Sequence, residues 1–100
     1  MLVVIGHIHI EATDVAVFLA EMATFGEAAR AHDGCLFFAV APEDFAAGRM
    51  LVAERWRDQA ALDNHLAAED TAAFVARWGS RMKSDVVKFD AANERGLLAR

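Results

Sequence analysis

Hydrophobic and polar residues alternate at the start of the chain, a period of two that predicts a β-strand over residues 2–10. One face of this strand carries Val4, Gly6, Ile8 and Ile10, and the other carries Val3, Ile5, His7 and His9. Segments 35–41 and 49–57 show the same period, and a short apolar segment over 84–90 predicts a fourth strand. The first two strands are apolar on both faces, so both sides of the predicted sheet need a cover.

Between the strands, apolar residues recur every three to four positions, which predicts helices. Thr13-Asp14 supplies an N-cap for a first helix of about twenty residues, which His32-Asp33-Gly34 ends. A second helical region follows Asp58, and its apolar line consists of Leu62, Leu66, Phe74, Trp78 and Met82. An unbroken helix would also place the Asp70 carboxylate on that line, at a high desolvation cost. We therefore expect a break near Glu69-Asp70, with Asp70 capping a fresh helix.

The order strand, helix, strand, strand, helices, strand predicts an α+β, ferredoxin-like βαββαβ fold, in which helices cover one face of a four-stranded antiparallel sheet. The 100 residues are expected to form a single domain, 1–100, with a core over about 1–90 and a C-terminal tail over 91–100. Because the helices cover one face only, the second apolar face predicts a homodimer packed sheet against sheet.

Charge and composition narrow the classes of partner. The net charge is −5 and the ten Lys and Arg are scattered, which argues against nucleic acid and against an anionic membrane surface as partners. A lone cysteine, Cys35, and the absence of a signal peptide or a spanning apolar run favour a cytoplasmic protein. No metal and no nucleotide or flavin cofactor is expected, although His7-x-His9 with Glu54 or His65 would offer a weak metal alternative.

Four polar residues fall in otherwise apolar settings: His7, His9, Glu54 and His65. The first and third strands are neighbours in this fold, so His7 and Glu54 would be adjacent if their faces coincide. His65 points toward the sheet, and Trp56, Phe74 and Trp78 would complete a small apolar pocket whose polar groups can take up a proton. Three structural alternatives stay open: the histidines as partly buried strand residues, Glu54 as an ion-pair partner of Arg55 or Arg57 across a dimer, and the aromatic residues as ordinary core.

The segment Glu54-Arg55-Trp56 through Leu62-Asp63-Asn64-His65, an E-x-W…A-L-x-x-H string followed by Ala73-Phe74, resembles the antibiotic biosynthesis monooxygenase (ABM) family. The start Met1 to Ile8 and Asp33-Gly34-Cys35-Leu36 share the resemblance. It implies a dimeric α/β barrel with one pocket per subunit, and oxidation of quinol or polyphenolic substrates by O2 without metal, flavin or haem. By position, the pocket would take His7, Val52, Glu54, Trp56, Leu62 and His65.

Two departures from the family pattern bear on the activity. Many quinol-type members carry a second histidine a few residues after the one that His65 matches, whereas this chain has Asp70 in that neighbourhood. The Asn, Trp and His pattern of haem-degrading members is not reproduced. We expect a cofactor-independent monooxygenase acting on a quinol or hydroxylated, polyketide-like aromatic substrate. The expected catalytic residues are His65, His7 and Trp56, and the expected substrate-binding residues are Val52, Glu54, Leu62, Phe74 and Trp78. The alternative is a non-catalytic dimeric barrel that binds a small ligand or serves in a stress response, with haem degradation as a third hypothesis.

Overall fold

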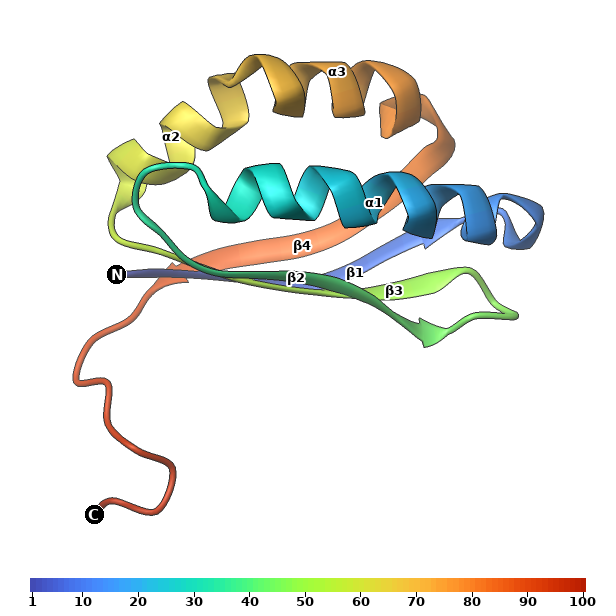
Figure 1. Ribbon diagram of the computed structural model, residues 1–100. Helices are drawn as coiled ribbons and strands as arrows, with labels where there is room; N and C mark the ends of the chain where they lie inside the picture. Colours follow the sequence, from blue (N-terminus) through green and yellow to red (C-terminus); the bar gives the residue numbers. More distant parts are fainter.

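Four strands form one antiparallel sheet in the order β2-β3-β1-β4, and all helices lie on one of its faces, as Figure 1 shows for the computed structural model, which describes residues 1–100. The elements in chain order are β1 (Leu2–Ile10), the 3₁₀ turn η1 (Ala12–Asp14), α1 (Val15–Arg30), β2 (Cys35–Asp44), β3 (Arg49–Trp56), α2 (Gln59–Ala67), α3 (Glu69–Trp78), the 3₁₀ turn η2 (Gly79–Arg81) and β4 (Met82–Asp90). The predicted ferredoxin-like α+β fold is confirmed. No helix is both long and apolar enough to cross a lipid bilayer.

The predicted interruption of the second helical region is also confirmed, with one change at the cap. Ala68 separates α2 from α3 with an extended backbone (φ −64°, ψ 148°), and Ala68 itself is the N-cap of α3. Asp70 therefore lies in the first turn of α3, where its carboxylate accepts the backbone N–H of Thr71 at 2.8 Å. A negative charge there complements the helix dipole, so the residue that would disrupt a longer helix stabilises the start of a shorter one.

The first helix is shorter than expected. Helix α1 has 16 residues because Ala12–Asp14 form the 3₁₀ turn η1 before it, and the predicted cap residue Asp14 makes no side-chain capping hydrogen bond. Asp58 does cap α2, since its carboxylate accepts the N–H of Ala61 at 2.9 Å. This cap fixes the start of α2, and thereby places the side chains one and two turns later against the sheet.

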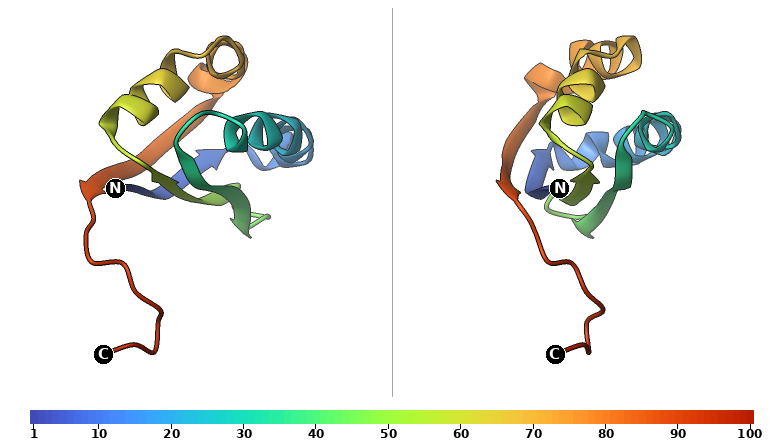
Figure 2. Two further views of the ribbon diagram at one scale, coloured as in Figure 1. Left: turned by 60° about the vertical axis from the view of Figure 1, so that its left-hand side comes forward. Right: turned by 90° about the vertical axis from the view of Figure 1, so that its left-hand side faces the viewer.

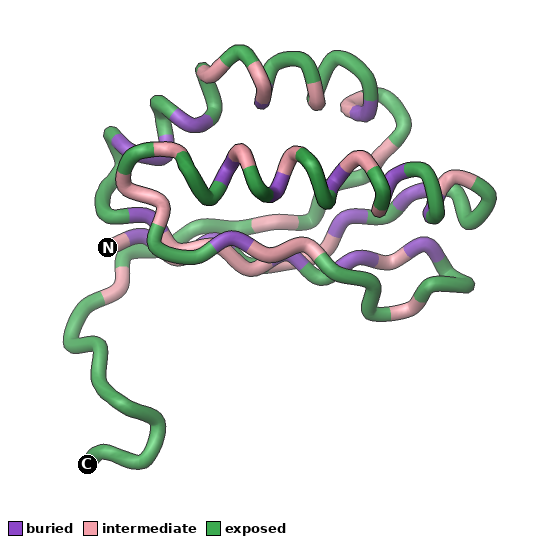
Figure 3. Tube along the Cα trace, in the orientation of Figure 1, coloured by how far each residue is buried: buried purple, intermediate pink, exposed green.

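The strand register separates two faces of the sheet. In β1, Val4 pairs with Glu54 of β3, and the neighbouring pair joins Ile5 to Ala53. Even-numbered residues of β1 and β3 therefore face the helices, where the buried core gathers (Figure 3), and odd-numbered residues face the other way. The largest fully buried side chains of this core are Trp56, Trp78, Phe18, Met50, Val15 and Val52.

No helix or strand covers the face of the sheet away from the helices, as the two views of Figure 2 show. Large apolar side chains are 41–58% exposed there, namely Ile5, Phe37, Leu51, Val87 and Phe89. After β4, residues 91–100 leave the sheet on this same side without helix or strand (Figure 1), and Leu97 is 97% exposed. An apolar surface of this kind is typical of an interface with another molecule.

Candidate functional site

His65 lies on the inner side of α2 and is only 4% exposed. Its imidazole lies against the indole of Trp56 from β3, with ring centroids 4.4 Å apart and planes inclined by 31°. Phe25 of α1 and Phe38 of β2 approach the same imidazole, at centroid distances of 6.0 and 5.8 Å. Elements from every layer of the fold thus surround one titratable side chain with aromatic carbon.

A hydrogen-bonded row leads from His65 toward the surface. Nδ1 of His65 lies 2.8 Å from Nδ1 of His32, which belongs to the turn between α1 and β2. Nε2 of His32 lies 2.9 and 3.0 Å from the two carboxylate oxygens of Asp70 in α3. The side chain of His32 is 18% exposed and that of Asp70 is 40% exposed. The row therefore connects a buried imidazole with a carboxylate that water reaches.

The electrostatics of the row follow from burial. The pKa of His65 is lowered to about 4: burial is the largest cause, the nearby His32 acts in the same direction, and the Asp70 carboxylate opposes both. Burial pushes the pKa of Asp70 upward, but hydrogen bonds from His32 and from Thr71 N–H outweigh it, so this pKa lies below its usual value. At neutral pH, His65 is therefore a neutral imidazole and Asp70 is an ionised carboxylate.

Trp56 contacts a second titratable group. Its indole Nε1 donates a 2.9 Å hydrogen bond to Oε1 of Glu54, two residues earlier on the same face of β3. Burial raises the pKa of Glu54, and the indole hydrogen bond opposes this. His65 on the ring and Glu54 on the N–H thus flank one fully buried indole. Two of the polar residues picked out from the sequence, Glu54 and His65, are brought together at Trp56.

The other expected pocket residues divide into two groups. Val52 and Leu62 are buried on the inner side, and Phe74 stacks on Phe25 at a centroid distance of 4.6 Å, one aromatic contact away from His65. Trp78 lies at the other end of α3 from Asp70, where it is fully buried against Phe18. Trp78 therefore belongs to the core around Phe18.

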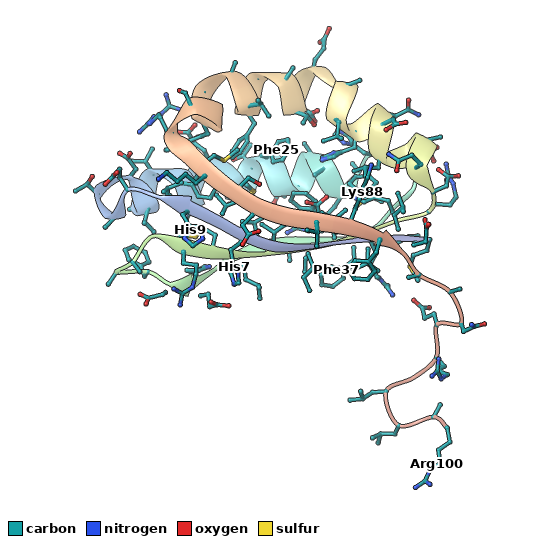
Figure 4. All side chains as sticks on the ribbon, turned by 180° about the vertical axis from the view of Figure 1, so that it is seen from behind. His7, His9, Phe25, Phe37, Lys88 and Arg100 are labelled. Carbon is teal, nitrogen blue, oxygen red and sulfur yellow. The ribbon has the colours of Figure 1, made fainter.

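His7 does not join this cluster. It pairs with Leu51 on the face of the sheet away from the helices, where Figure 4 shows it on the same side as Phe37, and its Nε2 lies 3.1 Å from the Glu43 carboxylate. His9 is exposed on the same face. The adjacency of His7 and Glu54 required their faces to coincide, and they do not: Glu54 pairs with Val4, three residues before His7, and an odd number of residues along a strand reverses the face.

Sequence reasoning missed three residues of this region. It interpreted His32 only as a helix stop and Asp70 only as a cap, although the two hydrogen-bond each other. The third is Thr71, whose Oγ1 is the one buried side-chain polar atom without a hydrogen-bond partner. The signal available for His32 was its position as a polar residue directly before the turn residues Asp33-Gly34. No local pattern in the sequence predicts that this turn lies next to the start of α3.

Replacing Thr71 with valine is expected to raise the free energy of unfolding by up to about 1 kcal/mol. The reason is that the hydroxyl is buried without a partner and valine has nearly the same shape. Urea unfolding of both proteins at one concentration measures this difference. A loss of stability would show that the hydroxyl has a partner inside the folded chain.

A hollow of about 500 Å³ runs between α1 and α3 next to the cluster. Phe25 and Phe74 line it, Asp70 also lines it, and the ion pair of Glu21 and Arg77 belongs to the same lining. Asp70 belongs to the hydrogen-bonded row and Phe25 contacts the imidazole of His65, so the hollow adjoins the row at its Asp70 end. No group of three or more His, Cys, Asp or Glu side chains is arranged to hold a metal ion.

Comparison with known proteins points to one family. No curated protein matches the sequence. Three solved structures share the fold: a candidate antibiotic biosynthesis monooxygenase from Deinococcus radiodurans (20% identity, TM-score 0.85, 99% of this chain and 100% of that chain), an antibiotic biosynthesis monooxygenase (28%, 0.81, 93% and 100%), and a candidate member from Caulobacter crescentus (20%, 0.81, 92% and 90%). The family described as antibiotic biosynthesis monooxygenase matches residues 1–77. Since this match spans more than three quarters of the 100 residues, the chain belongs to the antibiotic biosynthesis monooxygenase family.

Proposed function

We propose that the protein is a monooxygenase that oxidises a quinol or another hydroxylated, electron-rich aromatic compound with O2 and without a cofactor. His65 accepts the proton that the substrate loses. The observation that carries this proposal is the state of His65, which is buried against Trp56, neutral at neutral pH, and free of any hydrogen bond at Nε2. Nε2 of His65 is also not fully buried: it makes no hydrogen bond, and the one fully buried side-chain polar atom that lacks a partner is Oγ1 of Thr71.

A neutral imidazole in apolar surroundings suits this chemistry. Removing a proton from a hydroxylated aromatic ring leaves an electron-rich anion, which transfers an electron to O2 and then combines with the superoxide formed. The resulting peroxide still carries a hydrogen on the oxygenated carbon, and this hydrogen leaves with the outer oxygen as hydroxide when the O–O bond breaks. One oxygen atom thus enters the product, and the hydroxide becomes water by taking back the proton removed first. The substrate itself supplies the electrons, and the protein has to supply a base and a water-poor site.

The surroundings of His65 fit a flat aromatic ligand. Trp56, Phe25, Phe38 and the stacked Phe74 present aromatic carbon, and the hollow between α1 and α3 has the size of a site for a small organic molecule. Glu54, with Val52 and Leu62 on the inner side, supplies a carboxyl group that can hold a substrate hydroxyl through the oxygen not bonded to Trp56.

Oxygen uptake by the metal-stripped protein, measured with hydroquinones, naphthoquinols and anthrone-like phenols, tests the proposal. We expect uptake above the autoxidation blank, with product that carries one oxygen atom from 18O2. The His9→Ala variant is the matched control, because His9 is an exposed imidazole on the other face of the sheet. Rates equal to the blank across the panel would contradict the proposal in favour of a module that only binds a small ligand.

We also propose that the functional unit is a homodimer packed through the uncovered face of the sheet. Val87→Asp on this face is expected to weaken the dimer by about tenfold or more, because each interface would then bury a carboxylate. Val17→Asp on α1 is the control, since Val17 is 48% exposed and Val87 is 58% exposed. Sedimentation over a concentration series measures the difference, and a wild-type monomer at micromolar concentration would refute the dimer.

A further inference from the structure

We propose that His32 holds the substrate's proton during turnover, that Asp70 fixes the tautomer of His32, and that His65 passes the proton in both directions while staying neutral. This inference rests on the proposed function of His65, and it assigns roles to two residues outside the sequence-predicted site. The geometry that carries it is the continuous row Asp70, His32, His65, with contacts of 2.9 and 2.8 Å.

The row determines which ring nitrogens carry hydrogen. An ionised carboxylate only accepts hydrogen bonds, so Nε2 of His32 carries the hydrogen that points to Asp70. A neutral His32 then has a bare Nδ1, and the 2.8 Å contact requires that Nδ1 of His65 carries the hydrogen between them. Nε2 of His65 is consequently left with its lone pair. Asp70 thus sets, through His32, the one tautomer in which His65 can accept a proton from a ligand.

Proton uptake then moves charge along the row. When Nε2 of His65 takes the substrate's proton, its Nδ1–H hydrogen passes to Nδ1 of His32. His65 ends as the opposite neutral tautomer, with hydrogen on Nε2, and His32 becomes an imidazolium beside the Asp70 carboxylate. The positive charge therefore rests 2.9 Å from a negative charge at the partly exposed end of the row, and none rests in the aromatic surroundings of His65.

The overall reaction requires that the proton held by His32 be returned. Substrate and O2 give product and water with no net uptake or release of protons, so the proton removed first must return to the hydroxide that leaves the peroxide. After uptake, Nε2–H of His65 is a donor facing the ligand. Passing that hydrogen to hydroxide forms water, and the hydrogen on Nδ1 of His32 returns to Nδ1 of His65. Both imidazoles end in their starting tautomers, ready for another turnover.

Few charged groups surround this pair. Asp70 of α3 is the charged side chain that contacts it, whereas β3, β2 and α1 face His65 with Trp56, Phe38 and Phe25, which carry no charge. Glu54 accepts the hydrogen bond of the Trp56 indole N–H and makes no contact with either imidazole. Asp33, next to His32 in the chain, is paired with Arg57. The titration of the pair should therefore depend mainly on Asp70.

A pH titration of the imidazole nitrogens by 1H–15N NMR tests the assignment without any substrate. At high pH we expect hydrogen on Nδ1 of His65 and on Nε2 of His32. On acidification, His32 should become doubly protonated while the hydrogen of His65 moves to Nε2. Hydrogen on Nε2 of His65 at high pH, or His65 as the doubly protonated ring, would overturn the proposal.

Two variants separate this role from a purely structural one. Asp70→Asn should lower the pH midpoint of proton uptake by the pair by about 1 unit or more, because the favourable negative charge is gone. Asp63→Asn is the matched control, since Asp63 is an exposed carboxylate of α2, and its titration should equal that of the wild type. An unchanged midpoint in Asp70→Asn would overturn the role of Asp70.

His32→Gln keeps a polar side chain that cannot take up the proton. We expect kcat to fall about tenfold or more with KM changed less than about twofold, because the change affects proton transfer and not ligand contact. An equal kcat would overturn the relay. If the wild-type protein oxidises nothing in the substrate panel, the proposed oxygenase function fails, and the NMR titration still decides where the proton resides.

Discussion

His65→Ala is expected to lower O2-dependent product formation by about 10²-fold or more, the usual contribution of a positioned general base. The reason is specific to this site: His65 is the imidazole that lies against Trp56, and its Nε2 is the ring nitrogen of the His32–His65 pair that makes no hydrogen bond. Oxygen uptake and product formation, measured with the best substrate of the panel, give the ratio of rates. His65→Gln, which keeps more of the volume, separates loss of the base from the effect of a cavity.

The pH dependence of the same rate adds a second readout. The pKa of His65 is lowered to about 4, chiefly by burial, so this ring does not become doubly protonated in the ordinary histidine range, and the acid limb of the profile reports proton uptake by the row as a whole. As the pH falls, the proton taken up by the row removes the acceptor, so the rate falls on the acid side. His9→Ala should follow the wild-type profile. A His65→Ala variant with the wild-type rate would remove His65 from the mechanism.

Local patterns in the sequence were sufficient for most of the fold. Alternation in β1 and β3 indicated the two faces, since the pleat of a strand depends on neighbouring residues alone. The carboxylate at Asp70 indicated the break between α2 and α3, because an apolar helix face would have had to bury it. The extent of η1 and the ends of β2 and β4 depend on tertiary contacts and were not predictable in this way.

Local sequence patterns predicted only part of the candidate site. Glu54, Trp56 and His65 lie within twelve residues and meet through one strand-to-helix connection, so the sequence was informative about them. Placing His7 required knowledge of the register between β1 and β3. The sequence did carry one signal for it: the wholly apolar face of β1 packs inward, and His7 lies on the other face. The contacts of His32 with His65 and Asp70 join residues 33 and 38 positions apart, and they depend on how the helices dock on the sheet.

Gly6→Ala is expected to reduce the free energy of unfolding by about 4 kcal/mol, the largest stability effect that we predict for a single methyl group. Gly6 lies in the middle of β1 with φ +154°, a conformation that side chains with a Cβ rarely adopt. A Cβ built there would lie 2.0 Å from the carbonyl oxygen of Asp85 and 2.7 Å from Cα of Val86, both backbone atoms of β4. Backbone cannot rotate away as a side chain can, so β4 would have to separate from β1.

Gly96→Ala is the matched control, because a Cβ at Gly96 meets nothing within 4 Å. Urea unfolding at one protein concentration should show a large loss for Gly6→Ala and none for Gly96→Ala, with the concentration fixed because a dimer couples stability to it. Hydrogen exchange should locate the loss in the β1–β4 ladder and leave β2–β3 protected. Equal stability of the two variants would mean that β4 pairs with β1 more loosely at Gly6 than the register of Gly6 with Val86 requires.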